Sequence, residues 1–323
     1  MYRKISAIVF PTIIAVGILA YMLYRVWDDL IKALQHLVPV WLAIAVFICL
    51  IAWVLRGWRY STILNSLEYS VRLVISTACI FVSQTANLII PARLGDFVRV
   101  FILRHEYSTT YSEGVSSIVV ERVFDIFTVA ILGAVALPFI FDVPSWFYVV
   151  IILPIAAGAI FFILLFCTGK CTAENKYIRI VLTMLHEIRK ASLSVRSLIV
   201  LSASSIVIWL FDVSVCVAVV LMLGQKIPFP VVVLAIVIGN LVKAVPLTPG
   251  GVGTYELALT AVFTLAGIPW EMAFLIAVID HLIKNLVTLA GGIVSIYYFG
   301  DWVVPSIKSA FTKKMTGGTE SEP

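Results

Sequence analysis

Charged residues are scarce in this sequence of 323 residues, and their scarcity excludes a soluble fold. Only 13% of the residues are charged, against about a quarter in soluble domains, and 62% are hydrophobic. The mean hydropathy is +1.08. A soluble domain of this length could not cover so much apolar surface, so we expect the chain to lie in a bilayer.

The sequence also lacks paired cysteines and the motifs of known catalytic sites. Cys167 and Cys171 are too widely spaced for a redox pair, and we interpret all five cysteines as free thiols. No ATP-binding motif, acidic metal cluster, nucleophile elbow or histidine acid–base pair is recognisable. We therefore expect no metal, no cofactor and no enzymatic activity. The net charge of +5 does not indicate nucleic-acid binding, because the basic residues sort by membrane side.

Six apolar segments are long enough to cross a bilayer as helices, which takes about 20 residues. They cover residues 5–24, 40–59, 115–140, 146–167, 198–223 and 271–299. Fifteen basic residues, including Arg56 and Arg59, then fall on the side of the termini and three fall on the other side. The positive-inside rule predicts a multi-pass protein of the cell membrane with both termini cytoplasmic.

Two further apolar stretches, 73–104 and 230–267, are interrupted by proline and glycine. The interrupting residues are Pro91, Gly95, Pro246, Pro249, Gly250, Gly251 and Gly253. Proline removes a helix donor and glycine relaxes the backbone, so a helix should break at each site. Irregular backbone at membrane depth needs cover from protein or a wet cavity. We expect two re-entrant hairpins that meet inside the protein; the alternative is two pairs of short crossings.

The two broken stretches resemble one another, which predicts an internal repeat. Gly95 and Gly253 are 158 positions apart, and Glu121 and Asp280 are 159 apart. Each half would hold three spans and one re-entrant broken helix, and the odd number of crossings inverts the second half. The predicted fold is an all-α integral membrane protein with one polytopic domain over 1–300 and a cytoplasmic tail over 301–323. Its inverted repeats would cover about 1–140 and about 146–300, as in secondary transporters; chance similarity is the alternative.

Eleven ionisable residues fall at membrane depth, six acids and five bases. They are Arg93, Asp96, Arg99, Glu121, Arg122, Asp125, Asp212, Lys243, Glu256, Asp280 and Lys284. Each unpaired charge there costs about 2.5–3.5 kcal/mol, so most must pair or face water. Glu121 and Asp125 lie one turn apart, so either one of them holds a proton or a cation lies nearby, for which Arg93 and Arg99 are candidates. Asp280 and Lys284 are spaced to pair along one helix.

The charged residues at membrane depth allow two interpretations. They either lock helices together as salt bridges or line a cavity that holds a lipid headgroup. Arginine grips phosphate oxygens in a bidentate way, and hairpin tips add backbone amides that attract anions. This favours a phosphate-bearing amphiphile. The candidate headgroup residues are Asn87, Arg93, Asp96, Arg99, Glu121, Arg122, Asp125, Glu256, Asp280 and Lys284.

The segment 168–197 is the largest soluble piece. Ile178, Val181, Leu185 and Ile188 fall on one face of a helix there. This pattern predicts either an interfacial helix on anionic headgroups or a plain amphipathic connector.

Three motifs follow one another in a fixed order: Asn87…Pro91-x-Arg93-x-Gly95-Asp96-x-x-Arg99, then Glu121-Arg122-x-x-Asp125, then Pro249-Gly250-Gly251-x-Gly253-x-x-Glu256. In this order they resemble the flippase-like family. That family is also named for the transmembrane region of lysylphosphatidylglycerol synthase and includes the UPF0104 membrane proteins. The resemblance covers about 5–300. It implies eight membrane segments and a lipid-translocating role. It also implies a central cavity lined by Arg93, Asp96, Arg99, Glu121, Arg122, Asp125 and Glu256.

Two departures from the family pattern stand out. Asp96 occupies a place where the family often has glutamate, and the run from Asp280 to Asn285 has no clear counterpart. The synthases' soluble aminoacyl-transferase domain has no counterpart either, so we do not expect this chain to make a lysyl-lipid. The leading hypothesis is a lipid flippase. Two alternatives stay open: a lipid-modifying membrane enzyme, and a non-transporting partner of a glycosyltransferase or cell-envelope lipid assembly.

Overall fold

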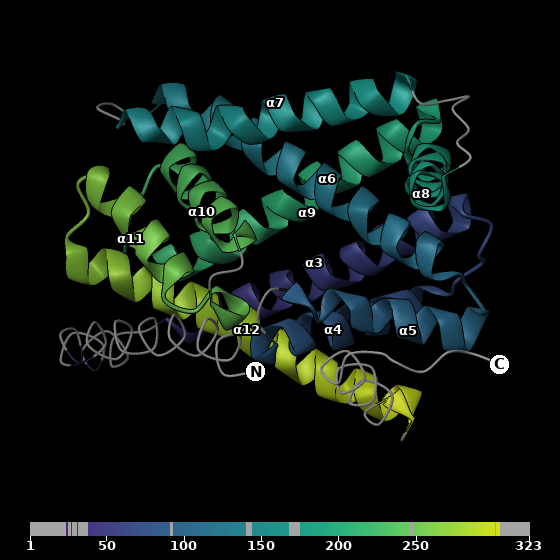
Figure 1. Cartoon of the computed structure of the whole chain (residues 1–323). Coiled ribbons are helices and arrows are strands. Elements are labelled where there is room, and N and C mark those ends of the chain that lie inside the picture. The colour runs from purple at the N-terminus through teal and green to yellow at the C-terminus, as the bar shows by residue number, and fades with distance from the viewer. Residues whose placement is uncertain are drawn as a thin grey trace, which may run out of the picture.

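The structure, a computed structural model, describes residues 38–90, 93–139, 144–167, 175–245, 248–300 and 302–303, together with Tyr24, Trp27 and Ile31. Every regular element in these ranges is a helix (Figure 1). The described part of the chain therefore has the predicted all-α class. The prolines Pro91 and Pro246 lie outside the described residues, as do nearly all of the predicted first span and the predicted tail.

Four described helices are long and apolar enough to cross a membrane. They are α3 (Pro39–Ser66), α7 (Ser145–Cys167), α9 (Val195–Met222) and α12 (Trp270–Phe299). Helix α6 (Tyr111–Ala136) has 26 residues, so it is about 39 Å long, enough for a hydrocarbon core of about 30 Å. It carries more charge than the other four and continues into the short helix η2 (Leu137–Phe139). These five helices match five of the predicted spans.

The two interrupted stretches form pairs of short helices. The first pair is α4 (Leu73–Ile89) and α5 (Asp96–Tyr107). The second is α10 (Phe229–Ala244) and α11 (Thr254–Leu265), with the one-turn helix η3 (Pro249–Gly251) between them. The helices of each pair pack against each other. With 12 to 17 residues, each is about 18–25 Å long, which is shorter than the hydrocarbon core. The predicted helix breaks are confirmed.

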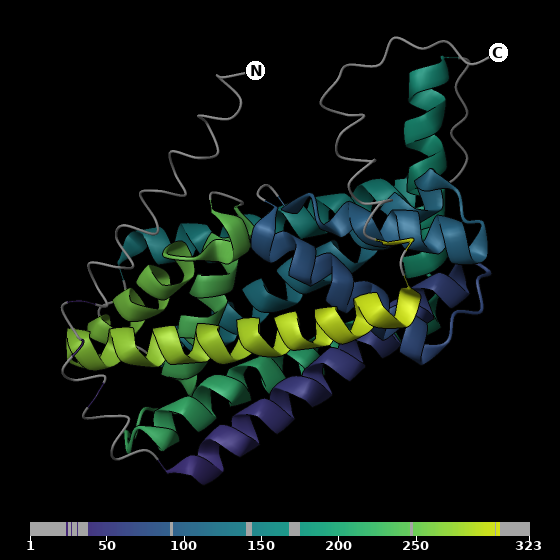
Figure 2. The ribbon, with the colours of Figure 1, turned by 90° about the horizontal axis from the view of Figure 1, so that it is seen from below.

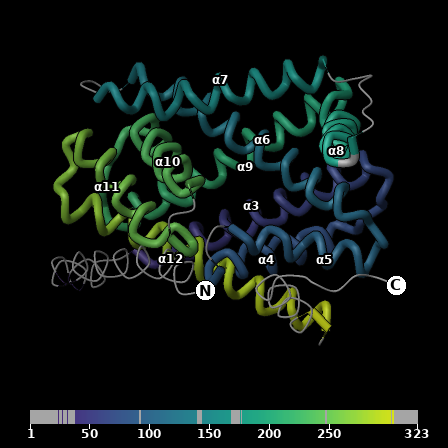
Figure 3. The backbone as a smooth tube through the Cα atoms, viewed as in Figure 1, coloured from purple at the N-terminus to yellow at the C-terminus, as the bar shows by residue number. Residues whose placement is uncertain are grey.

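The two hairpins lie toward opposite ends of the long helices, and their tips meet in the middle (Figure 3). A Cβ added to Gly250 would lie 3.0 Å from Leu88 Cδ2, so the second tip packs directly on the end of α4. Arg93, in the first tip, donates a 3.0 Å hydrogen bond from Nη2 to the Lys243 carbonyl oxygen. Side-chain and backbone contacts thus join the tips.

Several helix contacts of the first hairpin have similar counterparts in the second. Helix α3 packs along α9. Helix α4, the first helix of the first hairpin, packs on α12, and α10, the first helix of the second hairpin, packs on α6. Likewise α5 packs on α6 as α11 packs on α12. If α3, α4, α5 and α6 correspond to α9, α10, α11 and α12, each of these contacts has a counterpart.

Helix α8 (Lys176–Ser192) lies across the end of the bundle rather than along it. It is seen end-on in Figure 1 and lengthwise in Figure 2, at a steep angle to α12. Its first half exposes apolar side chains: Tyr177 is 79% exposed and Val181 55%. The predicted amphipathic helix is confirmed, and its contact with lipid headgroups stays a prediction.

Candidate functional site: an interior charged cavity

A cavity of about 170 Å³ lies where the hairpin tips meet the long helices. Drug-sized ligands occupy about 300–1,000 Å³, so this space fits a headgroup and not the tails of a lipid. Eight of the residues proposed from sequence line it: Asn87, Arg93, Glu121, Arg122, Asp125, Gly250, Gly251 and Lys284. Asp96, Arg99, Glu256 and Asp280 lie one layer behind, each bonded to a lining residue. Gly95, Pro249 and Gly253 shape the tips and do not line the cavity.

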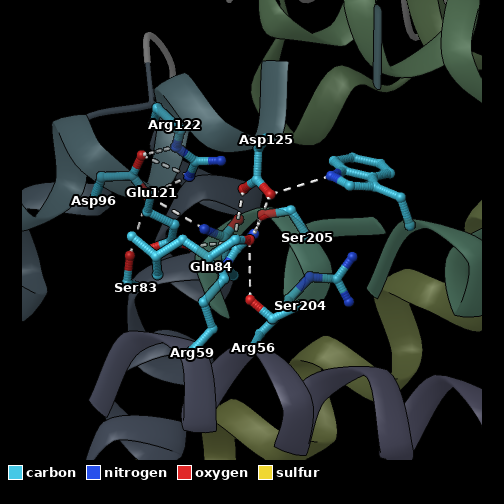
Figure 4. Close-up of polar contacts among 12 residues, drawn as sticks. Arg56, Arg59, Ser83, Gln84, Asp96, Glu121, Arg122, Asp125, Ser204 and Ser205 are labelled. Carbon is cyan, nitrogen blue, oxygen red and sulfur yellow. Dashed lines mark hydrogen bonds and ion pairs between the residues drawn. The ribbon is translucent and has the colours of Figure 1, made fainter. Parts of the chain in front are cut away.

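Asp96 joins three helices. Arg122 of α6 bonds both of its carboxylate oxygens, with Nη2 2.7 Å from Oδ2. Ser83 Oγ of α4 donates to Oδ1 at 3.2 Å (Figure 4). Asn87 Nδ2, also of α4, donates to the same oxygen at 2.8 Å. The start of α5 can approach α4 this closely because Gly95 has no side chain: a Cβ on Gly95 would lie 2.5 Å from the Asn87 backbone nitrogen. Asp96 therefore acts as a clamp within the first hairpin.

Arg59 of α3 separates the two carboxylates of α6. Its Nη1 lies 2.6 Å from Asp125 Oδ1, and its Nη2 lies 3.5 Å from Glu121 Oε1 (Figure 4). Arg99 of α5 donates to the other Glu121 oxygen, as expected from sequence. Arg59 and Arg99 are 1% and 0% exposed, so both ion pairs are buried. The cation beside Asp125 is Arg59 and not Arg93.

A second chain of charges connects α3, α9 and α12. Arg56 Nη2 lies 3.2 Å from Asp212 Oδ1, and Lys284 Nζ lies 3.4 Å from Asp212 Oδ2. Lys284 also lies 3.0 Å from Asp280 Oδ1, which confirms the pair expected along α12. Tyr255 of α11 donates a 2.7 Å hydrogen bond to Asp280. These contacts hold the second hairpin against the long helices.

The third group comprises Glu256, His281 and Lys243. Glu256 Oε2 accepts a 2.7 Å hydrogen bond from the Gly253 amide, so the first turn of α11 is capped by its own carboxylate. Glu256 Oε1 lies 2.7 Å from His281 Nδ1, and Lys243 Nζ lies 3.1 Å from His281 Nε2. We expected the backbone amides of the hairpin tips to attract an anion. At Gly253 that anion is a carboxylate of the protein itself, Glu256.

Arg93 has an unusual backbone and no acidic partner. Its φ of +52° lies in the left-handed region, which costs a non-glycine residue about 1–2 kcal/mol. Strain of this kind is typical of functional positions. Among the described residues, no carboxylate lies within 4.0 Å of its guanidinium group, and its side chain lines the cavity.

The sequence interpretation missed two bases of the interior, Arg59, which is buried, and Arg56, which is partly buried. Arg56 and Arg59 were counted on the cytoplasmic rim because the apolar run ends near residue 59, but α3 continues to Ser66 and places both inside. With them the interior holds seven bases and six acids, which reverses the small acidic excess counted from sequence. The role of His281 was also missed, because its partners lie 25 and 38 positions away in the chain.

Fold and site together define a multi-pass helical membrane protein whose ionised residues gather around two helix breaks. In the described ranges, no group of three potential ligands is arranged to hold a metal ion. The model of the lysylphosphatidylglycerol synthase TM region matches residues 8–292, and the chain belongs to that family.

Relatives of the chain include archaeal membrane proteins. It is 31% identical to glycosyltransferase AglD of Haloferax volcanii, over 87% of this chain and 52% of that protein, so it spans about half the length of AglD. It is 26% identical to the UPF0104 membrane protein MJ1078 of Methanocaldococcus jannaschii, over 65% of this chain and 92% of that one. A UPF0104 membrane protein of Methanothermobacter thermautotrophicus is 24% identical over 88% of this chain and 92% of its own. No solved structure matches.

Proposed function

We propose that the protein binds the phosphate-bearing headgroup of a membrane lipid in the interior cavity and translocates the lipid across the bilayer. The observation that carries this proposal is the charged cavity itself, enclosed by apolar helices at the junction of the two hairpins. The excess of one base over the acids in the protein interior suits an anionic guest. A headgroup crossing the hydrocarbon alone would lose its hydration, and the cavity would replace that hydration with side chains.

The same proposal assigns the architecture. The hairpins are re-entrant, and the two halves form an inverted repeat with both termini cytoplasmic. Support comes from the short hairpin helices, their approach from opposite ends of the bundle and the matched helix contacts. Rocking of one half against the other would open the cavity to each side in turn. The protein moves the lipid without changing it, and the movement is passive, ion-coupled or driven by a partner.

Liposome scrambling tests this function. Purified protein is reconstituted with an acyl-labelled acidic phospholipid, and a membrane-impermeant quencher reports how fast the label changes leaflet. Wild-type protein should accelerate the exchange, and Arg93→Ala should reduce the rate at least tenfold. Arg104→Ala, a control on the exposed end of α5, should keep the wild-type rate. Equal rates for wild-type protein and Arg93→Ala would contradict the assigned site.

A second candidate is a non-transporting partner of a glycosyltransferase or lipid-assembly enzyme. The likeness to a protein named glycosyltransferase AglD favours it, because this chain covers only about half of that protein. On this candidate the cavity would hold a lipid-linked substrate for the partner. Co-purification with a glycosyltransferase, together with failure to scramble any lipid, would support it over translocation.

A further inference from the structure

Lys243 is a cavity-lining cation that the headgroup assignment from sequence leaves out. It lies in the last turn of α10, at the start of the second hairpin tip, where the helix dipole favours a positive charge. Among the described residues, no carboxylate lies within 4.0 Å of its ammonium group. Every acid that lines the cavity has a basic partner other than Lys243. Glu121 pairs with Arg99, Asp125 pairs with Arg59, and Asp212 pairs with Arg56 and Lys284.

A relay of side chains holds the Lys243 ammonium group in place. Glu256 accepts from His281 Nδ1 at 2.7 Å, which leaves Nε2 as the acceptor that faces Lys243 Nζ at 3.1 Å. The Gly253 amide fixes Glu256 in turn. The positive charge of Lys243 is thus balanced through a neutral imidazole, and its remaining N–H bonds are available to a ligand.

The stem of Lys243 is fixed as well. It crosses Gly251, whose φ is +78°, and a Cβ there would lie 2.6 Å from Lys243 Cγ. The ammonium group lies 5.4 Å from the centroid of the Tyr255 ring, within cation–π range. A long flexible side chain is therefore held in one orientation before a ligand arrives, which lowers the entropy cost of binding.

Arg93 reaches the same place from the other hairpin. Its guanidinium group donates to the Lys243 carbonyl oxygen at 3.0 Å, and both side chains line the cavity. The two cavity-lining cations that have no acidic partner among the described residues thus come from the two opposed tips. The remaining cavity-lining bases are bound to acids: Arg56 to Asp212, Arg122 to Asp96 and Lys284 to Asp280.

We propose that Arg93 and Lys243 together bind the phosphate of the lipid headgroup, and that His281 and Glu256 position Lys243 for that contact. This inference rests on the proposed function and names the anion-binding pair of the same site. A phosphate has several oxygens, so one can meet the planar arginine fork and another the point charge of lysine. Because the interior carries one excess positive charge, the ligand is a headgroup of net negative charge and not a zwitterionic one.

Calorimetric titration of the purified full chain in detergent tests this pair. The probes are dioctanoyl phosphatidic acid, dioctanoylglycerol, dioctanoyl phosphatidylcholine and inorganic phosphate. Wild-type protein should bind phosphatidic acid at least tenfold more tightly than each of the other three. Lys243→Met keeps the stem and removes the charge, and it should weaken phosphatidic acid binding about tenfold or more. Lys190→Met, at an exposed lysine of α8, is the matched control and should bind like wild type.

The positioning role needs its own comparison. His281→Leu removes the acceptor for Lys243 and should weaken binding severalfold. His281→Gln offers an amide oxygen in its place and should recover most of the loss, although both substitutions remove the imidazole. Equal binding by His281→Leu and His281→Gln, at equal thermal stability, would overturn the positioning role.

The outcomes separate this inference from the proposed function. Scrambling by wild type, with Lys243→Met binding phosphatidic acid as wild type does, would overturn the pair and leave translocation standing. Wild type that neither binds nor scrambles an acidic phospholipid would overturn both. Inorganic phosphate binding as tightly as phosphatidic acid would make this a free-phosphate site and overturn the assignment to a lipid headgroup. A monodisperse Lys243→Met protein with wild-type thermal stability ensures that weakened binding reflects the lost charge.

Discussion

Arg59 Nη1 lies 2.6 Å from Asp125 Oδ1, and this buried ion pair joins α3 to α6. In the other half of the molecule, Lys284 Nζ lies 3.4 Å from Asp212 Oδ2 and joins α12 to α9. Asp125 and Lys284 are 159 positions apart, the same offset as Glu121 and Asp280. If α3 corresponds to α9 and α6 to α12, the two ion pairs join corresponding helices with their charges exchanged. Each half would then be braced by the same kind of contact.

Removing one partner of the Arg59–Asp125 pair should destabilise the protein strongly. Arg59→Met leaves Asp125 buried without its main cation, a change that costs about 3–5 kcal/mol for buried pairs. Arg59→Met combined with Asp125→Leu should recover much of that loss, because no unpaired charge remains. Denaturant unfolding in detergent measures both. A double variant as unstable as the sum of the two single variants would contradict direct pairing.

Gly95→Ala should disrupt the first hairpin. The new Cβ would lie 2.5 Å from the Asn87 backbone nitrogen and 2.7 Å from the Ser83 carbonyl oxygen, so the backbone of one helix would have to shift. We expect α5 to separate from α4 and the thermal midpoint to fall by several degrees or more. Gly267→Ala is the comparison for backbone strain alone, because its φ of +86° strains any side chain while a Cβ there meets nothing within 4 Å, and it should lower the midpoint less. Similar midpoints for the two variants would show that the hairpin does not depend on this close approach.

The sequence identified the helix breaks and most of the charged residues that line the cavity, and the reasons are local. Proline and glycine break a helix whatever surrounds them, and Asp280 and Lys284 meet because four residues make one turn. The partners of Arg59 and His281 depend on helices far apart in the chain, so spacing alone did not predict them. The prediction that Arg59 lies at the cytoplasmic rim was wrong for a related reason. The charge of Arg59 lowers the local hydropathy, so the predicted span ended before α3 does.

Tyr69 provides a pH-dependent contact outside the membrane spans. Its hydroxyl donates a 2.7 Å hydrogen bond to Glu113 Oε2, and this bond, with partial burial, raises the pKa of Tyr69 to about 12. Because the folded pKa exceeds the ordinary value of about 10, the stabilisation is complete below about pH 10 and is lost as the pH rises through the raised value. Tyr69→Phe should flatten the decline of the thermal midpoint over that interval. An unchanged decline in the variant would contradict the assignment.

Helix α8 should lie in the headgroup region with its apolar face toward the acyl chains. A spin label on Val181→Cys, in protein whose Cys167 and Cys171 are serine, should be accessible to oxygen and shielded from a water-soluble nickel complex. The same label on Arg179→Cys, about 200° around the helix, should show the reverse preference. Equal accessibility of both positions to the nickel complex would make α8 an ordinary soluble connector.

The most direct test of translocation locks the two hairpin tips together. A Cβ on Gly250 would lie 3.6 Å from Leu88 Cα, close enough for a disulfide in the double variant Leu88→Cys/Gly250→Cys. If the halves must move apart to pass a headgroup, the oxidised protein should scramble an acidic phospholipid at least tenfold more slowly than the same sample after reduction. Wild-type protein carried through the same oxidation and reduction should keep one rate. Equal scrambling by the fully cross-linked and the reduced double variant would contradict translocation through this cavity.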